Sequence, residues 1–155
     1  MPIVIVAIHI LLLYFTRYIA WPENFLWSYL NLKGLTLYKD IFYIYPPFYF
    51  LLLTGFFKIA GISLFSLQVF SYGIIALTDL LLWLATKKKI WPLFIYLPLQ
   101  IYFEGNGMWP DQLLTPIFLL CYLAFNSKKY FLLGIFMGLA LMTKQTAVYF
   151  AVVIF

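Results

Sequence analysis

Long apolar runs are the feature that most constrains how this chain can fold. The run at residues 62–86 carries a single charged side chain, Asp79, and other runs span residues 2–20, 47–60, 90–103, 113–125 and 130–155. A membrane-spanning helix needs about 20 predominantly apolar residues. Only 10% of the residues are charged and 66% are hydrophobic, which lies far outside the range of soluble globular proteins. We therefore expect an all-α, polytopic transmembrane helix bundle, with residues 1–155 forming a single transmembrane domain.

Two lysine clusters indicate how the runs are oriented. Residues 87–89 and residues 128–129 are all lysine, and basic residues beside spans favour the cytoplasmic face. We expect about five membrane spans in the chain, and the first of them is an uncleaved N-terminal span. Residues 47–60 are short and contain Lys58, so we interpret this run as interfacial rather than spanning. An alternative topology stays open, in which residues 47–60 cross the membrane and the triple lysine faces outward.

The predicted orientation brings most of the carboxylates to the outer face. The first outer loop, residues 21–61, is rich in Trp and Tyr and is expected to form interfacial, juxtamembrane helices. It holds Glu23 and Asp40, and the second outer loop begins with Glu104 and ends with Asp111. Two loops that each bring carboxylates to one surface favour chemistry at the membrane interface.

Several function classes have no support in the sequence. The net charge of +5 comes from basic residues that are scattered rather than gathered into a patch, so nucleic acid is not an expected partner. The one cysteine, Cys121, can form no disulfide within the chain. No Walker loop, dinucleotide fingerprint, HExxH motif or Gly-x-Ser-x-Gly elbow is present. Nucleotide hydrolysis, metalloproteolysis and serine hydrolysis are therefore not predicted.

Each candidate acid has a catalytic and a structural interpretation. Glu23 follows the first span, where a carboxylate can take a proton from an acceptor hydroxyl or can simply favour a helix N-terminus. Asp40 is a substrate or metal ligand, or else a turn residue or ion-pair partner of Lys39. Asp111 follows Pro110 and is either a ligand in the second outer loop or the cap of the next helix.

Further polar residues extend the candidate site. Glu104 and Asn106 belong to the segment EGNGMWPD, whose glycines allow the backbone to turn close to a ligand, so a metal or sugar-hydroxyl site is one interpretation. Lys144 lies near the outer end of the last run and either reaches lipid headgroups or holds the phosphate of a lipid-linked substrate. Asp79, an acid inside a span, is either a functional residue or, as we favour, an interhelical hydrogen-bonding residue, and His9 is interpreted as isolated.

Two sequence patterns resemble the GT-C superfamily of glycosyltransferases. The stretch from Gly34 through Tyr38 to Asp40, followed by a Pro-Pro pair, resembles the G-x-x-x-Tyr-x-Asp … Pro-Pro region of that family. Residues 134–144, GIFMGLALMTK, resemble its G-x-x-x-G-Leu-Ala-x-x-x-Lys span. These multi-spanning enzymes, which include protein O-mannosyltransferase and aminoarabinose transferase relatives, use polyprenyl-phosphate-linked sugars. The resemblance covers nearly the whole chain in pattern and corresponds to the N-terminal portion of a longer family member.

The resemblance implies an inverting sugar transfer. A carboxylate of the first outer loop activates an acceptor hydroxyl, which attacks the anomeric carbon while the lipid phosphate leaves. The matching positions are Glu23 as general base, Asp40 and Asp111 as supporting acids, and Lys144 at the donor phosphate. Many relatives have Asp-Glu at the first position, whereas Pro22 precedes the glutamate in this chain. No cofactor is specified with certainty, and assistance by a divalent cation stays open.

The predicted function is therefore that of an integral membrane glycosyltransferase. It transfers a sugar from a polyprenyl-phosphate donor to a hydroxyl of a protein, lipid or glycan acceptor. We expect a multi-pass protein of the plasma membrane, in contact with membrane lipids, with its active site facing outward. Two alternatives stay open. One is a non-enzymatic transporter or channel subunit, which predicts ionisable groups at the midplane on broken helices, and the other is a catalytically silent membrane assembly protein.

Overall fold

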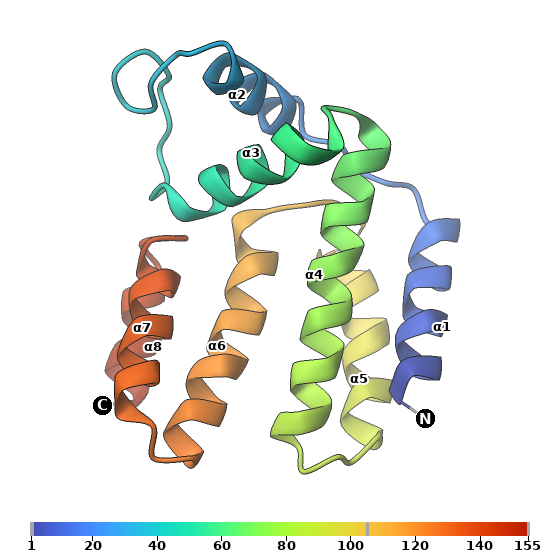
Figure 1. Ribbon diagram of the computed structural model, residues 1–155. Helices are drawn as coiled ribbons and strands as arrows, with labels where there is room; N and C mark the ends of the chain where they lie inside the picture. The colour runs from blue at the N-terminus through green and yellow to red at the C-terminus, as the bar shows by residue number, and fades with distance from the viewer. Residues whose placement is uncertain (1, 105, 155) are drawn as a thin grey trace.

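The computed structural model describes residues 2–104 and 106–154, which form helices joined by turns and loops (Figure 1). The described part has no β-strand beyond isolated bridges. It contains α1 (Pro2–Phe15), α2 (Pro22–Leu32), α3 (Phe48–Ala60), α4 (Leu64–Ala85), α5 (Trp91–Leu99), the π-helical η1 (Gln100–Glu104), α6 (Pro110–Asn126), α7 (Tyr130–Leu141) and α8 (Ala147–Ile154). The prediction of an all-α fold is confirmed for these residues.

Local sequence sets where several helices begin and end. Pro22 and Pro110 lie at the first positions of α2 and α6, where the missing N–H removes no helical hydrogen bond. Gly61 follows α3 with a φ of 78°, a backbone conformation open mainly to glycine. Ser63 then caps α4, because its side chain accepts a hydrogen bond of 3.0 Å from the Ser66 N–H. These residues let the chain turn between α3 and α4.

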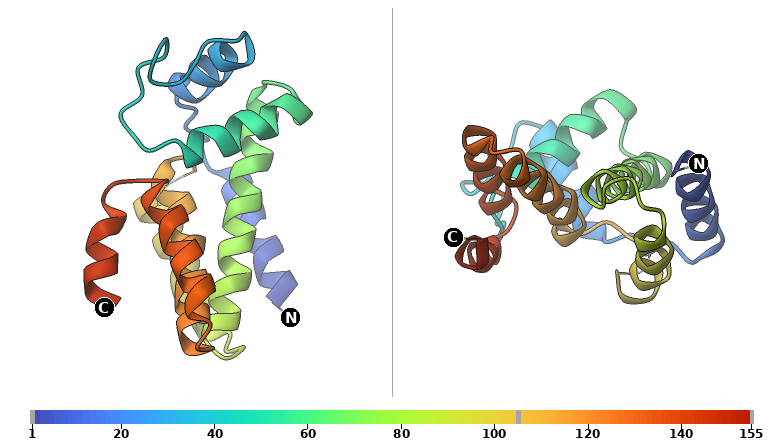
Figure 2. Two further views of the ribbon diagram at one scale, coloured as in Figure 1. Left: turned by 60° about the vertical axis from the view of Figure 1, so that its left-hand side comes forward. Right: turned by 90° about the horizontal axis from the view of Figure 1, so that it is seen from below.

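Helices α1, α4, α5, α6 and α7 lie side by side, and α2 and α3 lie across one end of them. Figure 1 shows α2 and α3 at the upper end of this bundle. Helix α6 packs between α4 and α7, while α1 and α5 both pack against α4. Seen from below in Figure 2, α8 lies beside α7 on the opposite side of the bundle from α1. The α2–α3 pair thus covers the end at which α6 begins.

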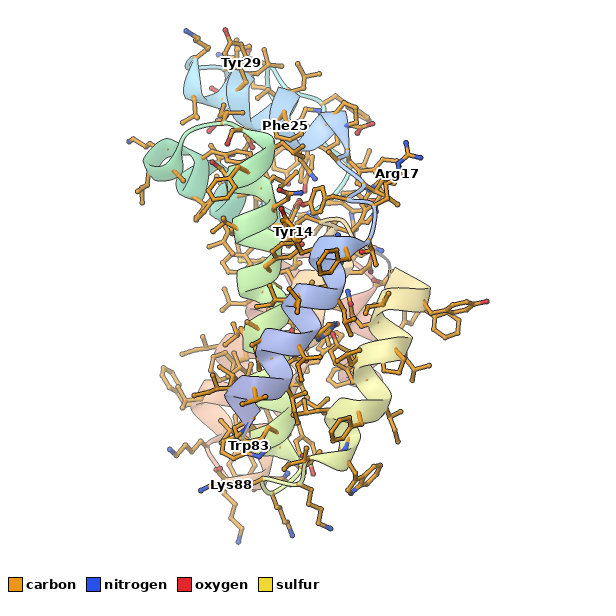
Figure 3. The ribbon with its side chains drawn as sticks, turned by 90° about the vertical axis from the view of Figure 1, so that its right-hand side faces the viewer. Tyr14, Arg17, Phe25, Tyr29, Trp83 and Lys88 are labelled. Atoms are coloured by element: carbon orange, nitrogen blue, oxygen red, sulfur yellow. The ribbon has the colours of Figure 1, made fainter. Side chains whose placement is uncertain are left out.

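The two ends of the bundle differ in charge. The lysines at residues 87–89 and 128–129 lie in the α4–α5 and α6–α7 turns, both at the end opposite α2 and α3 (Figure 1). Figure 3 shows Lys88 at this end and Tyr29 of α2 at the other. Asp111 lies in the first turn of α6, at the α2–α3 end. Lysine clusters and the candidate acid are therefore separated along the length of the bundle.

A continuous apolar core joins the bundle to the covering helices. Phe57 of α3, Leu67 of α4, Cys121 of α6 and Leu133 of α7 are each at most 2% exposed. They belong to one cluster with Met108 of the loop before α6. Burying an aliphatic or aromatic side chain of this size contributes roughly 1.5–3 kcal/mol. The core therefore continues from α3 through α4 and α6 to α7.

Among the described helices, α4 is the one that is long and apolar enough to cross a membrane by length and composition. The other apolar helices are shorter: Pro2–Phe15, Phe48–Ala60, Trp91–Phe103 and Tyr130–Leu141. The length of the helices therefore does not show a polytopic bundle of about five spans, and that expectation stays a prediction. The positions of α2 and α3 across the end of the bundle are those expected of interfacial helices, and their contact with a membrane stays a prediction.

Two predicted spans are shorter than expected for identifiable reasons. At the end of α1, the Asn106 side chain donates a hydrogen bond of 2.6 Å to Leu13 O, which satisfies a carbonyl that a longer helix would use. The run at residues 130–155 forms two helices instead of one, because the chain turns back after α7. In this turn, Met142 O accepts a hydrogen bond of 2.8 Å from Phe48 N. Helix α8 then returns beside α7 (Figure 2). The prediction of one outward span over residues 130–155 is wrong.

Candidate functional site

Two neighbouring pockets lie at the α2–α3 end of the bundle. The first, called the Asp111 pocket, has a volume of about 420 Å³ and is lined by Tyr45, Phe103, Trp109, Asp111 and Gln112. The second, called the Glu23 pocket, has a volume of about 180 Å³, and its lining includes Trp21, Glu23, Trp27, Tyr43, Tyr45 and Trp109. Tyr45 and Trp109 belong to both linings and form a shared wall. Two of the predicted acids therefore line adjoining cavities.

Asp111 and Lys144 meet beside the Asp111 pocket. Lys144 Nζ donates to both carboxylate oxygens of Asp111 at 2.7 Å, although the two residues are 33 positions apart in the chain. The lysine and aspartate side chains are 22% and 56% exposed. At this exposure an ion pair contributes ~1 kcal/mol or less to folding. The pair is therefore better understood as a polar arrangement open to a ligand than as a stabilising element of the fold.

The turn between α7 and α8 holds Lys144 in place. The Phe48 N–H donates to Met142 O at 2.8 Å, and the Gln145 side-chain amide donates to Ile44 O at 2.8 Å. Both contacts tie the turn to the segment that leads into α3. The lysine therefore approaches Asp111 from a turn that is fixed at two points.

Gln112 joins the site although the sequence pattern did not predict it. It lies in the first turn of α6, lines the Asp111 pocket and is 4% exposed. Neither its Nε2 nor its Oε1 has a hydrogen-bond partner within residues 2–104 and 106–154. A buried polar group without a partner costs about 1–3 kcal/mol, so this amide is suited to a ligand that supplies the partners. The sequence feature that could have pointed to Gln112 is its position, because it is a second polar residue directly after Asp111 at the start of an apolar helix.

Glu23 is the carboxylate of the second pocket. It lies in the first turn of α2, where the helix N-terminus favours a negative charge. No ion pair joins it to another residue of the described chain. The adjacent Asn24 donates to Met108 O at 3.1 Å and accepts a hydrogen bond of 3.0 Å from the Tyr49 hydroxyl. These contacts fasten α2 to α3 and to the loop before α6, which fixes where Glu23 lies.

Aromatic rings form most of the wall of the Glu23 pocket. The rings of Trp21 and Trp109 have centres 4.5 Å apart, and those of Trp27 and Tyr43 have centres 5.0 Å apart. The Tyr43 hydroxyl is buried and has no hydrogen-bond partner in the part of the chain that the structure describes. Burial raises the pKa of Tyr43, with smaller contributions from two neighbouring tyrosines. The hydroxyl therefore keeps its proton at neutral pH.

Asp40 lies outside the linings of both pockets. Its Oδ2 accepts a hydrogen bond of 2.8 Å from the Thr36 N–H, and its own N–H donates to Thr36 O at 2.9 Å. The side chain therefore closes an exposed turn, as one of its two interpretations predicted. The same loop continues to Tyr43 and Tyr45, so Asp40 bears on the site through the loop rather than by contact.

Asn106 holds the end of α1. Its Nδ2 donates to Leu13 O at 2.6 Å and to Thr16 O at 3.2 Å, and its backbone carbonyl accepts a hydrogen bond of 2.6 Å from Ile19 N. These contacts describe a structural role, and a role of Asn106 in substrate binding stays a prediction. Glu104 ends η1, and its side chain lies outside the described residues.

A second polar cluster lies deep in the bundle. His9 Nδ1 lies 2.9 Å from Asp79 Oδ2, and His9 Nε2 lies 3.0 Å from Gln100 Oε1. All three residues are at most 2% exposed. The interhelical hydrogen bond predicted for Asp79 is confirmed, whereas the interpretation of His9 as isolated is wrong. The sequence hid this contact because 70 positions separate the two residues.

No group of three or more His, Cys, Asp and Glu side chains in the described chain is arranged to hold a metal ion. Asp111 is paired with Lys144, and Glu23 lines the other pocket. The donors among the described side chains do not fit a divalent cation, and we assign no step to one.

Comparison of the chain with protein-family models, curated proteins and solved structures finds no match. The resemblance to the GT-C superfamily thus rests on sequence patterns alone and stays a prediction. The arrangement of Asp111, Lys144 and Glu23 around two adjoining pockets is independent of that resemblance. A functional proposal can therefore start from this arrangement.

Proposed function

We propose that this chain belongs to an integral membrane glycosyltransferase that moves a sugar from a polyprenyl-phosphate donor to an acceptor hydroxyl, with inversion. One observation carries the proposal: Asp111 and Lys144 meet beside one pocket, and Glu23 lines a second pocket across a shared wall. Three residues that the sequence pattern assigned to one reaction therefore lie at one end of the bundle.

The two pockets suit two substrates. The larger Asp111 pocket would take the sugar phosphate of the donor. The Lys144 ammonium has three N–H groups and its ion pair uses two, which leaves one for a phosphate oxygen. The unpartnered Gln112 amide offers both a donor and an acceptor to sugar hydroxyls. The Glu23 pocket would take the acceptor.

The proposed reaction uses these side chains in one displacement. Glu23 takes the proton of the acceptor hydroxyl, and the hydroxyl oxygen forms a bond to the anomeric carbon. The bond between that carbon and the phosphate oxygen breaks, and the polyprenyl phosphate leaves with the electron pair. Lys144 stabilises the negative charge that develops on the phosphate, while Asp111 orients the lysine. Asp40 supports the site by shaping the loop that carries two of its tyrosines.

The charge difference between the two ends supports a membrane placement. The lysine turns are dense basic clusters without an acid, whereas the α2–α3 end mixes scattered basic residues with acids, so the lysine turns would face inward and the α2–α3 end outward. Large apolar side chains such as Phe94 of α5 and Phe131 of α7, 62% and 82% exposed, suit contact with lipid. We therefore place α1, α4, α5, α6 and α7 across the plasma membrane as a multi-pass bundle. Helices shorter than the bilayer core are accommodated by local thinning of the bilayer.

Substitutions at the site test the enzyme directly. Membranes that contain the full chain are assayed for sugar transfer from a panel of polyprenyl-phosphate donors. We expect Glu23→Gln to lower transfer by about 100-fold or more, because the general base is lost. Lys144→Gln is expected mainly to raise the KM for the donor. Lys128→Gln, a matched lysine change at the far end, should leave transfer unchanged, and equal transfer by all variants would contradict the proposal.

The cluster of His9, Asp79 and Gln100 favours a second candidate, a transporter subunit. That class predicts ionisable groups deep in a bundle on interrupted helices. Here α5 contains Pro98 and passes into the π-helical η1 at Gln100. If Asp79→Asn abolishes the activity of the protein in cells while Glu23→Gln preserves it, the transporter is favoured over the glycosyltransferase.

A further inference from the structure

Aromatic rings that face different directions line much of the Glu23 pocket. Its walls include Trp21, Trp27, Tyr43, Tyr45 and Trp109. Neighbouring rings among them meet at 51°, 81° and 73° rather than in parallel stacks. The face of an aromatic ring is electron-rich, and Trp attracts a cation most strongly. The walls therefore form a cage whose electrostatics suit a positive charge.

The polar groups of this pocket also favour a cation. Glu23 lines the pocket and has no ion-pair partner among the described residues, and none of the residues that line it is lysine or arginine. Tyr43 is 5% exposed, and its hydroxyl has no hydrogen-bond partner in the described chain. The hydroxyl oxygen can accept a hydrogen bond from an N–H group. The buried Tyr43 hydroxyl thus lacks a partner that an ammonium would supply, and the exposed Glu23 carboxylate is free to pair with the charge.

One ammonium group, that of Lys144, already lies against the Tyr45 ring of the shared wall. Lys144 Nζ lies 5.8 Å from the centre of the Tyr45 ring, within the range of a cation–π interaction. The charge of this lysine is matched by its two contacts of 2.7 Å with Asp111. It therefore opposes a second cation in the Glu23 pocket only weakly.

We propose that the Glu23 pocket binds an alkylammonium group, with Glu23 as counter-ion, the aromatic rings as cage and the Tyr43 hydroxyl as hydrogen-bond acceptor. A volume of about 180 Å³ suits a small head, such as an ethanolamine or choline group, rather than a whole substrate. This binding goes beyond the proposed sugar transfer and depends on no step of it. A bound ammonium does engage the carboxylate that the transfer uses as a base, so the two events compete unless one acceptor carries both groups.

Tryptophan fluorescence reports on this pocket because three of the five tryptophans line it. Trp83→Phe and Trp91→Phe remove the other two. The full chain, in a sugar-based detergent without ammonium groups, is titrated with choline and with its uncharged isostere 3,3-dimethylbutan-1-ol. We expect saturable quenching by choline and about tenfold weaker binding of the isostere. Equal binding of the two compounds, or equal binding of a neutral methyl glycoside, would overturn the proposal.

Matched variants separate the charge from the cage. Glu23→Gln is expected to weaken choline binding by about tenfold, since the counter-ion is lost. Lys128→Gln removes a charge at the opposite end of the bundle and should bind choline as the parent chain does. Tyr43→Phe should weaken the binding of ethanolamine, which can donate an N–H, but not that of choline, which has none. Unchanged choline binding by Glu23→Gln would contradict the proposal that this pocket binds a cation.

The source of the ammonium is resolved in lipid nanodiscs. Ethanolamine and choline phospholipids are compared with phosphatidylglycerol, whose headgroup has no ammonium. A quenched signal in the first two, with no further response to added choline, identifies a lipid headgroup as the ligand. Undiminished titration by choline in all three identifies a soluble amine. A chain that responds to choline in neither detergent nor any nanodisc has no such site, whatever its transfer activity.

Discussion

The buried amide of Gln112 sets the energetics of the Asp111 pocket at the scale of a single residue. Both of its polar side-chain atoms lack partners in the described chain, and the residue is 4% exposed. While the pocket is empty, the unpartnered amide lowers the stability of the fold, and a polar ligand that supplies partners would remove this cost. Such costs are typical of residues retained for function rather than for folding.

Gln112→Leu is expected to stabilise the empty protein while weakening the proposed donor binding. Removing unpartnered buried groups should add about 1–3 kcal/mol, or several degrees in Tm. Thermal unfolding of the purified chain checks the stability, and the KM for the donor checks the binding. Gln145→Leu is the matched control with the opposite sign, because that amide makes a hydrogen bond of 2.8 Å to Ile44 O. A fall in Tm for Gln112→Leu would contradict the interpretation.

Sequence reasoning could find some of these residues but not their partners. Glu23, Asp111 and Lys144 stand out because charged side chains are rare in an apolar chain, and all three lie at or beside the pockets. The hydrogen bond from Asn106 to α1 joins residues 93 positions apart. The turn closed by Asp40 depends on local backbone geometry. Neither contact leaves a signal in residue type alone.

At the scale of helices, a buried polar cluster aligns α1, α4 and η1. His9 bonds to Asp79 on α4 and to Gln100 of η1 with the side chains almost fully buried. An apolar contact between helices tolerates sliding, whereas a hydrogen bond at low dielectric fixes one position. The cluster therefore specifies the register of α1 against α4, which in turn sets where α1 ends beneath α2.

The cluster predicts strong coupling between His9 and Asp79. His9→Leu alone leaves the Asp79 carboxyl buried without its partner and should cost about 3–5 kcal/mol, as should Asp79→Leu. The double variant should cost less than the sum of the two by about 0.5–3 kcal/mol, because neither polar group is then orphaned. Denaturant unfolding of the three variants gives the coupling, and additive losses would show that the two side chains do not interact.

The helices themselves were only partly predictable. Prolines and glycines marked the starts of α2 and α6 and the break after α3. Hydropathy overestimated the lengths of the first and last runs, because it counts composition and not the hydrogen bonds that end a helix. The turn after α7 is held by contacts to Phe48 and Ile44, about a hundred positions earlier in the chain. Such long-range contacts cannot be read from an apolar run.

At the scale of the whole molecule, the separation of the lysine turns from the α2–α3 end predicts opposite accessibility. In a Cys121→Ser background, a cysteine in place of the exposed Lys39 should react with a membrane-impermeant maleimide added to intact cells. Cysteines in place of Lys88 or Lys128 should react only after permeabilisation. Labelling of all three in intact cells would contradict the placement, and labelling of the last two alone would invert it.

The wall formed by Tyr45 and Trp109 has a consequence for how the two cavities behave together. A ligand in one cavity that contacts these rings would move them or limit their motion, and this would change the lining of the other cavity. Binding linkage is reciprocal, so the factor by which occupancy of one cavity changes affinity in the other is the same in both directions. A ligand bound in either cavity is therefore expected to change the affinity of the other cavity, which would make the two a heterotropic pair.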